Sequence, residues 1–290
     1  MHTGSAHAKL NFVFEAAAQR DAHLYLRQLD RLLPGAVVGF YLVGSTALGG
    51  YRRRRSDLDF VGVLDSEVER RCVGRLRVAH AQSGFVTGSR AIFEGRTPLT
   101  GTLNGLFVRQ SDLARPVTQI EPLASQVGPE FKVGKAGSDL SPVGWKVLSE
   151  KGIAIRGPQP SRLNLDPEPE RLRSWTAGNL DTYWRPWVER VIRAPQRRFA
   201  LRPRYWTAWG VLGVPRLHCT IATGEIISKE AAGEYAFSEF APMWQPLIMD
   251  ALGYWREEPQ HHLSLSAGQR ARMTVDFVSS VVEDAKRLFR

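Results

Sequence analysis

The stretch Y-L-V-G-S-T-A-L-G-G-Y-R-R-R-R-S-D-L-D-F-V-G-V-L, residues 41–64, decides the fold of this chain. Its apolar start continues a run that opens at Val37, and this run predicts a buried strand that stops at Gly44. Gly44 and Ser45 let the backbone approach an anion closely, and a helical turn beginning there would direct amide groups at that anion. The stretch therefore predicts a phosphate-binding loop directly after a strand.

Two carboxylates follow this loop. A second strand is predicted to open at Asp57, and residues two apart on a strand face the same way, so Asp57 and Asp59 project together. Mg²⁺ prefers oxygen ligands and bridges phosphate oxygens, so this pair predicts a metal site beside a nucleotide. The opposing interpretation is a serine that caps a turn and a solvated Asp pair, and the agreement of loop, spacing and strands argues against it.

The order strand, Gly-Ser, spacer and Asp-x-Asp resembles the signature of the nucleotidyltransferase superfamily. More narrowly it resembles the aminoglycoside nucleotidyltransferases of the streptomycin/spectinomycin adenylyltransferase type. The resemblance implies an α+β fold, in which an N-terminal nucleotidyltransferase domain with a mixed sheet precedes a C-terminal helical bundle. It also implies transfer of AMP from ATP, the substrate, to a hydroxyl of a small acceptor, with Mg²⁺ as cofactor. An aminoglycoside acceptor would imply antibiotic resistance.

A second motif, R-L-H-C-T-I-A-T-G-E-I-I-S-K-E-A-A, begins at Arg216. The resembled family has a similar helix–turn–helix, with an Arg on the first helix and a Lys opening the second. Carried across, Arg216 and Lys229 would contact the triphosphate, whose developing charge fixed cations stabilise. Gly44 and Ser45 would bind the same triphosphate. Ser56 would either assist through its hydroxyl or cap its own loop.

The family's general base is a Glu on the third strand, and this chain departs from that pattern. The matching segment L-N-G-L-F-V, residues 103–108, places Asn104 at the position, and an amide neither accepts the proton nor supplies an anionic metal ligand. Three explanations remain open. Asn104 is an inactivating change, natural or engineered; Asp112 or Glu94 replaces the base; or the acceptor needs little base assistance.

The acceptor contacts of the family are poorly matched as well. Its acidic residues for a cationic drug lie on the helix before the Arg, whereas residues 202–210 here contain no acid. Ammonium groups need carboxylate partners, so the acceptor could be a different hydroxylated compound. His218, on the Arg216 helix, could touch an acceptor, but a packed or capping histidine is the commoner case.

Composition sets the remaining bounds. The chain has 290 residues, enough for two domains, and a formal net charge of +10. Residues 52–55 are four arginines, which either attract phosphate or form a solvated loop tip. Cys72 and Cys219 lie far apart, and neither a secretory signal nor a membrane span is evident, so we expect a cytoplasmic protein. No nucleic-acid module is present, so nucleic acid is not an expected partner, and we expect a monomer.

Residues 1–157 are predicted to form the nucleotidyltransferase domain, the Pro-rich residues 158–169 a linker, and residues 170–290 the helical domain. Helical spacing and capping residues favour helices at 14–33, 67–81, 142–151, 170–192, 205–223 with a break or kink at Pro215, 228–240 and 266–288. Strands are predicted at 37–43, from 57 onward, at 102–108 and at 153–156.

Two further functions stay open. Asn104 favours a catalytically impaired homologue that binds nucleotide or drug without turnover. A protein-modifying nucleotidyltransferase of the toxin–antitoxin type is the other, although such chains are generally small and have a single domain.

Overall fold

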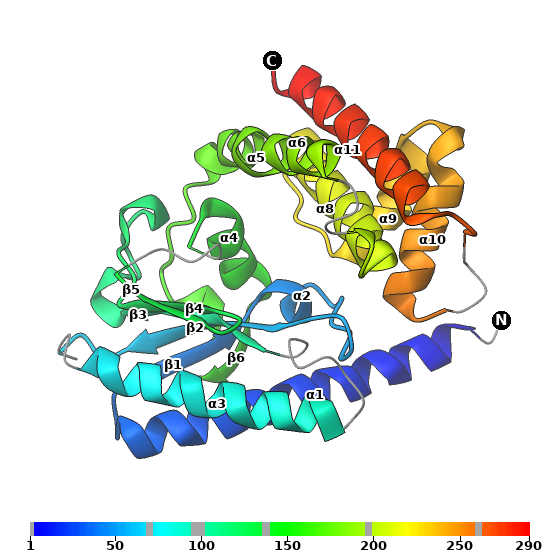
Figure 1. Ribbon diagram of the computed structural model, residues 1–290. Coiled ribbons are helices and arrows are strands. Elements are labelled where there is room, and N and C mark those ends of the chain that lie inside the picture. The colour runs from blue at the N-terminus through cyan, green and yellow to red at the C-terminus, as the bar shows by residue number, and fades with distance from the viewer. Residues whose placement is uncertain (1–2, 68–71, 94–101, 135–139, 195–198, 259–262) are drawn as a thin grey trace. The chain divides into compact units, whose positions relative to one another are not determined.

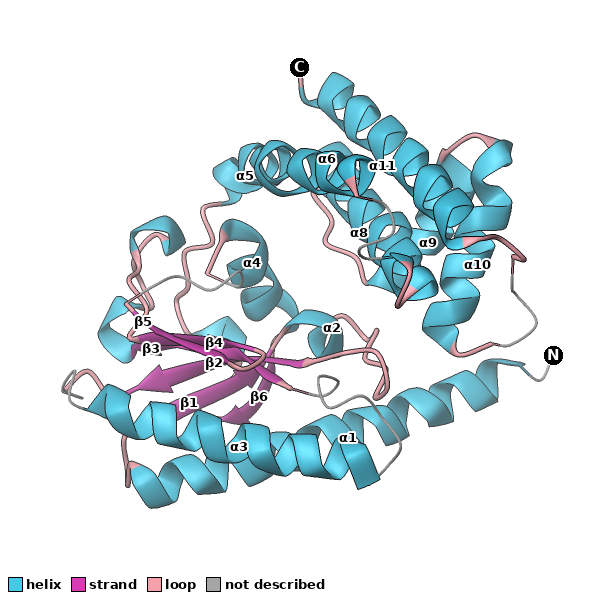
Figure 2. Ribbon diagram, in the orientation of Figure 1, coloured by secondary structure: helices cyan, strands magenta, loops and turns pink. Residues whose placement is uncertain are grey.

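The computed structural model describes residues 3–67, 72–93, 102–134, 140–194, 199–258 and 263–290. The chain divides into two compact units, Met1–Pro169 and Glu170–Arg290, each with its own hydrophobic core. Every described strand lies in the first unit, and the second is built of helices (Figure 2). The expected α+β class, a mixed sheet with helices followed by a helical domain, is confirmed.

A six-stranded mixed sheet forms the centre of the first unit, in the order β5-β4-β3-β2-β1-β6. Its strands are β1 Val37–Leu42, β2 Leu58–Leu64, β3 Leu103–Arg109, β4 Ala124–Val127, β5 Glu130–Val133 and β6 Ile153–Arg156. Among these, β2 and β3 run parallel and the other neighbours antiparallel. Parallel pairing brings the first residues of β2 and β3 to the same edge of the sheet.

Helices cover the sheet. The helices α1, Thr3–Leu32, and α3, Val73–Phe93, lie side by side against one face of the sheet (Figure 1). The short helix α2, Gly44–Ala47, contacts α4, Pro142–Lys151. As predicted, Ser141 caps α4, because its Oγ accepts a bond of 3.1 Å from the Gly144 amide.

The prediction for the second helix was wrong in its extent. A helix was expected over residues 67–81, ending near Gly84, but α3, Val73–Phe93, continues through Gly84 to Phe93; residues 68–71 of the expected helix lie outside the described residues. A Cβ placed on Gly84 would meet no atom within 4 Å. Gly84 therefore weakens the helix without ending it, because its φ is not in the left-handed region that a C-terminal glycine adopts.

Stacked aromatic rings fix the strands that carry the candidate site. The rings of Phe40 on β1 and Phe60 on β2 stack 4.8 Å apart, and Phe60 meets Phe107 on β3 edge-on at 5.3 Å. All three side chains are fully buried. A Cβ at Gly105 would lie 2.2 Å from the Phe60 carbonyl oxygen, so a larger residue there would separate β2 from β3.

The Pro-rich segment 158–169 is attached to the first unit. Pro116 and Asp166 form an isolated parallel β-bridge. The buried carboxylate of Glu168 accepts bonds from Thr118, 2.7 Å from its amide nitrogen and 3.0 Å from its hydroxyl oxygen. Two short 3₁₀ turns, Pro160–Arg162 and Pro169–Arg171, lie in or next to this segment.

The described helices of the second unit share a core that includes Trp184 and Trp187. They are α5 Leu172–Asn179, α6 Arg185–Arg193, α8 Pro203–Thr223, α9 Lys229–Glu239, α10 Gln245–Arg256 and α11 Ala267–Phe289. The helix predicted at 170–192 contains a π-helical turn, Leu180–Trp184, just before Pro186. A break or kink was predicted at Pro215, and α8 runs through this residue without a break. The helix α10 was not predicted.

A buried ion pair joins α10 to α11. Asp250 and Arg270 are each 2% exposed, and the Arg270 guanidinium donates to the Asp250 carboxylate. The same two side chains bond the backbone of Leu263: its amide donates to Asp250 Oδ1 at 2.9 Å, and Arg270 Nη2 donates to its carbonyl at 2.7 Å. Both charges are thus paired and hydrogen-bonded, as burial requires.

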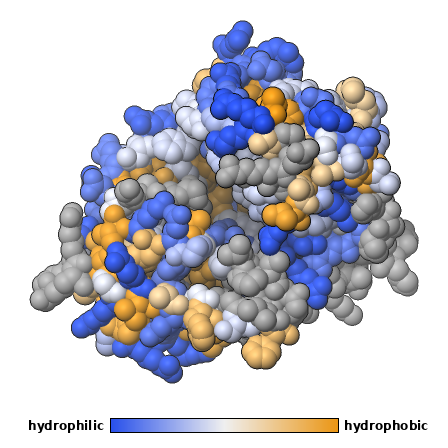
Figure 3. Space-filling model, in the orientation of Figure 1, coloured by the Kyte–Doolittle hydropathy of each residue, from blue (hydrophilic) through white to orange (hydrophobic). Residues whose placement is uncertain are grey.

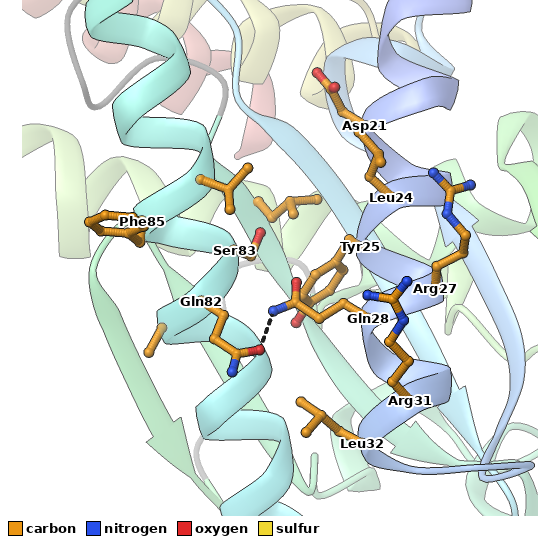
Figure 4. Close-up of a pocket in the computed structure, with 13 residues that line it drawn as sticks. Asp21, Leu24, Tyr25, Arg27, Gln28, Arg31, Leu32, Gln82, Ser83 and Phe85 are labelled. Carbon is orange, nitrogen blue, oxygen red and sulfur yellow. Dashed lines mark hydrogen bonds between the residues drawn. The ribbon is translucent and has the colours of Figure 1, made fainter.

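A groove of about 880 Å³ separates α1 from α3 (Figure 4). Its floor includes Tyr25 and Leu103, and Gln28 and Gln82 bond across it at 2.6 Å. The exposed Phe85 lies at its rim. Elsewhere, the face shown in Figure 3 is largely hydrophilic with scattered apolar patches. In the described part of the chain, no helix combines the length and apolarity needed to cross a bilayer.

Candidate functional site

The backbone at Gly44 brings the predicted loop against a carboxylate. Gly44 follows β1 with φ +58°, in the left-handed region that favours glycine. A Cβ at this position would lie 2.1 Å from Asp59 Oδ2, so the carboxylate occupies the space that any other side chain would fill. The Val43 amide also donates to the Asp59 carbonyl at 3.0 Å. The structure therefore brings Gly44 and Asp59 together, although they are fifteen positions apart in the chain.

Two hydroxyl groups lie on the turn after Gly44. The Ser45 and Thr46 hydroxyl oxygens are shielded from solvent and have no hydrogen-bond partner within the described residues. Buried hydroxyls in native proteins are almost always bonded, so an unsatisfied pair suits a ligand that supplies acceptors. Phosphate oxygens are acceptors, and a hydroxyl can donate to them.

Asp57 is held from the neighbouring strand. It directly precedes β2, and one of its carboxylate oxygens accepts a bond of 3.0 Å from the Thr102 hydroxyl. The other accepts from Asn104 Nδ2 at 3.1 Å. Leu58 between the two acids is buried, whereas Asp57 and Asp59 are partly exposed, as the alternation of a strand predicts.

Asn104 lies where the third strand was predicted to place it. In the parallel register it is opposite Asp59. Its Oδ1 accepts from the Gly128 amide at 2.8 Å, and a backbone amide can only donate, so the NH₂ group of Asn104 must face Asp57. Asn104 thus orients a carboxylate and cannot itself accept a proton from a substrate at that nitrogen.

Of the two acids considered as a replacement base, the structure places only Asp112, and this residue does not join the site. Asp112 follows the far end of β3, which extends about 17 Å beyond Asn104 at the usual rise per residue of a strand, and it pairs with Arg109 and Arg115. Glu94 lies outside the described residues. No cluster of three or more His, Cys, Asp or Glu side chains suited to a metal ion occurs among the described residues.

The two aspartates nevertheless fit a Mg²⁺ ion. The donor set is all oxygen: two carboxylates two residues apart, next to a loop with unsatisfied hydroxyls. Mg²⁺ commonly takes one or two carboxylates and fills its other positions with water and phosphate oxygens. Asp57 and Asp59 are therefore sufficient protein ligands for one such ion, and Asn104 adds no third charge.

The arginine loop is closed by Ser56. Its Oγ accepts from the Arg52 amide at 3.0 Å, and its own amide donates to the Arg52 carbonyl at 2.7 Å. Ser56 is buried and caps its loop, which is one of the two roles expected for it. Arg52 is only 9% exposed, and within residues 52–55 Arg54 alone is classed as exposed, so the run is not simply a solvated tip.

In the second unit, Arg216 and Lys229 belong to one helix–turn–helix. Arg216 Nε donates to the Ile227 carbonyl at 2.9 Å, and Lys229 opens α9 two residues later, after the capping residue Ser228. The Lys229 ammonium lies over an aromatic ring of α8 and another of α10. The two predicted cations are therefore attached to the same turn.

His218 is a packed residue, 1% exposed. Its Nε2 is 2.9 Å from Asp284, which can only accept, and in the neutral ring Nδ1 therefore accepts from the Tyr235 hydroxyl at 2.7 Å. Hydrogen bonds from Arg287 and then His218 lower the pKa of the Asp284 carboxyl, and burial raises the pKa of the Tyr235 phenol. These bonds connect α8, α9 and α11.

Replacing Gly44 by Ala tests the contact with Asp59. We expect a loss of stability of about 1–3 kcal/mol from the positive φ and a further displacement of the Asp59 carboxylate, which would lower any reaction at this site about a hundredfold. Gly49→Ala is the matched control: φ is +67°, but its added Cβ would meet nothing within 4 Å. Thermal unfolding and turnover of both variants separate the two effects, and equal turnover in both would contradict the contact.

Sequence reasoning missed several residues of the site. Thr102 was predicted only as the start of a strand, and Gly128 was not singled out. In the structure the Thr102 hydroxyl donates to Asp57, and the Gly128 amide donates to Asn104. The alternation of Thr102 and Asn104 on a strand was the available signal, because residues two apart share a face.

Comparisons with known proteins match both halves of the chain. Residues 24–121 match the family model described as "Nucleotidyltransferase domain", and residues 182–281 match "Aminoglycoside adenylyltransferase, C-terminal domain". No curated protein sequence gives a significant match. The chain is similar to the crystal structure of spectinomycin adenyltransferase AAD(9) from Enterococcus faecialis with ATP and spectinomycin. The TM-score is 0.62 at 15% identity, over 90% of this chain and 99% of that chain, and this identity supports the fold alone.

Proposed function

Because the chain belongs to the aminoglycoside nucleotidyltransferase-like family, we propose that it transfers AMP from Mg-ATP to a hydroxyl group of a small acceptor. The observation that carries the proposal is the Asp59 carboxylate packed against Gly44, with Asp57 two residues before it, inside the matched nucleotidyltransferase domain. ATP is proposed as the donor because the structural neighbour was crystallised with it. We propose cytoplasmic action as a monomer.

In the proposed reaction the acceptor oxygen bonds to the α-phosphorus and the bond to the β-phosphate oxygen breaks, so that pyrophosphate leaves. Asp57 and Asp59 would hold the Mg²⁺, which when bound polarises the phosphoryl oxygens. Gly44 and Ser45 contact the phosphates through backbone and hydroxyl donors. The acceptor proton leaves by a route other than Asn104, to solvent or to a phosphate oxygen.

The helical unit contributes cations in this proposal. Arg216 and Lys229, attached to one turn, bind the triphosphate and stabilise the charge that develops on pyrophosphate. The acceptor is a hydroxylated compound, and aminoglycosides are among the candidates because the neighbour was crystallised with spectinomycin. Residues 202–210 contain no acid, so we expect a weakly charged acceptor to be preferred over a polycation.

A transfer assay tests the proposal. The purified chain is incubated with ATP labelled at the α-phosphate, MgCl₂ and a panel of spectinomycin, streptomycin and uncharged polyols. We expect a labelled acceptor and pyrophosphate for at least one member, dependent on Mg²⁺. Mg-ATP binding by calorimetry with no labelled product on any acceptor would instead support the second candidate, a nucleotide-binding homologue, which Asn104 favours.

Replacing Asn104 by Asp should lower the melting temperature without Mg²⁺ and allow Mg²⁺ to raise it. The new carboxylate would lie about 3 Å from Asp57, so repulsion lowers the melting temperature in EDTA, whereas Mg²⁺ binding raises it by mass action. We also expect faster transfer, because a base and a third metal ligand are restored. Thermal unfolding in EDTA and in MgCl₂, with a rate measurement, checks this.

Asn104→Ala is the control for that experiment, since it removes both hydrogen bonds without adding charge. If the melting temperature of Asn104→Asp is the same in EDTA and in MgCl₂, the proposed metal position is contradicted. A transfer rate that is unchanged or lower, with Mg²⁺ stabilisation intact, would contradict the assignment of residue 104 as the position of the base.

A further inference from the structure

We infer that Trp209 and Trp255 position the ammonium group of Lys229, and so determine how tightly the helical unit binds the triphosphate. The inference rests on the proposed function of Lys229. Its Nζ lies 4.8 Å from the ring centroid of Trp209 on α8 and 4.4 Å from that of Trp255 on α10. Both distances are within the range of a cation–π interaction, for which indole is the best aromatic partner.

Helix stability does not explain a lysine at this position. Lys229 is the first residue of α9, where the helix dipole favours negative side chains and disfavours a cation. The Ser228 hydroxyl already caps the helix, accepting from the Ala231 amide at 3.2 Å, and Glu230 supplies the favourable negative charge. The two indole faces offset this unfavourable placement.

The rings themselves are fixed. Trp209 Nε1 donates to the Tyr183 hydroxyl at 3.0 Å, and the Tyr205 ring stacks on Trp209 with centroids 6.2 Å apart and planes 28° apart. Trp255 is 4% exposed in the core of the helical unit. A lysine side chain held by two fixed rings loses less rotamer freedom on binding an anion than a solvated one does.

The position of the second cation supports the same conclusion. Arg216 lies on α8, the helix that carries Trp209, and its bond to the Ile227 carbonyl ties it to the turn that ends at Lys229. The tryptophans, the arginine and the lysine are therefore parts of one arrangement on α8, α9 and α10. Trp209 and Trp255 pack with the core of the helical unit and also contact this cation.

A double-mutant cycle tests the inference. Trp209→Leu and Trp255→Leu are made in the native chain and in Lys229→Met, and the dissociation constant for Mg-ATP is measured by calorimetry. In the native chain we expect each change to weaken binding about tenfold, and Trp209→Phe to restore part of the loss. In Lys229→Met the same tryptophan changes should alter binding less than about twofold, since the residue through which they act is gone.

The outcomes separate the inference from the proposed function. Unchanged Mg-ATP binding in Lys229→Met would refute the proposed role of Lys229. Weaker binding in Lys229→Met with native affinity in both Trp→Leu variants, or equal losses in both backgrounds, would overturn the positioning role. Melting temperatures report folding, and Trp244→Leu, whose ring packs 5.5 Å from Phe277, is the control for loss of an indole elsewhere. If Trp255→Leu does not fold, the cycle with the partly buried Trp209 alone tests the inference.

Discussion

Asp59→Asn is expected to abolish nucleotidyl transfer, with a loss of at least about three orders of magnitude, and to leave the fold intact. In the proposed function Asp59 would hold Mg²⁺, and the bound ion would stabilise transition-state charge by several kcal/mol, so its loss corresponds to a rate loss of this size. The amide has the same shape, so it fits against Gly44, and the backbone bond from Val43 to residue 59 is retained. The measurement is pyrophosphate release at saturating Mg-ATP, together with the melting temperature.

Asp112→Asn is the matched control, because this carboxylate follows the opposite end of β3 and pairs with arginines there. We expect it to keep native turnover. Native turnover in Asp59→Asn would end the assignment of the site, and unfolding of that variant would show that the charge of Asp59 is needed for the fold.

Asp250→Ala is expected to destabilise the helical unit by about 3–5 kcal/mol, because it leaves the Arg270 charge buried without its partner. The Leu263 amide also loses its acceptor, as part of the same network. A loss of this size should lower the melting temperature of that unit by roughly 10 °C or more. Calorimetry of the whole chain, which can resolve two transitions for two units, is the measurement.

Asp276→Ala serves as the comparison. Asp276 is an exposed acid on α11, the helix that carries Arg270, and its removal should change stability by no more than about 0.5 kcal/mol. Equal effects of the two substitutions would mean that the buried pair contributes nothing beyond a surface charge.

The sequence was sufficient for the elements whose signals are local. The apolar run before Gly44 and the alternation around Leu58 gave β1 and β2, and Ser141 gave the start of α4. The hairpin of β4 and β5 escaped prediction because both strands have only four residues and β5 is largely exposed, so no buried periodicity marks it. Pro215 failed as a helix breaker because α8 is packed within the unit's core on several sides.

The candidate site was predictable only in part. Spacing alone placed the two aspartates on one face of a strand, and resemblance placed Asn104 on the next strand. The hydrogen-bond partners of Asp57 and Asn104 come from 24 to 47 positions away in sequence, as with Gly128 and Asn104, or Asn104 and Asp57. Such contacts depend on the parallel register of β2 with β3, which no single-chain pattern specifies.

The hydrogen bond from the Gly128 amide to Asn104 connects the β4–β5 hairpin turn to the candidate site. Asn104 also donates to Asp57. A change of length or conformation in the turn between β4 and β5 would therefore shift the Asp57 carboxylate, just before β2, without any change in the Asp-x-Asp motif itself. Substitutions and length changes in that turn are therefore expected to be tolerated less than the surface exposure of the turn alone would suggest.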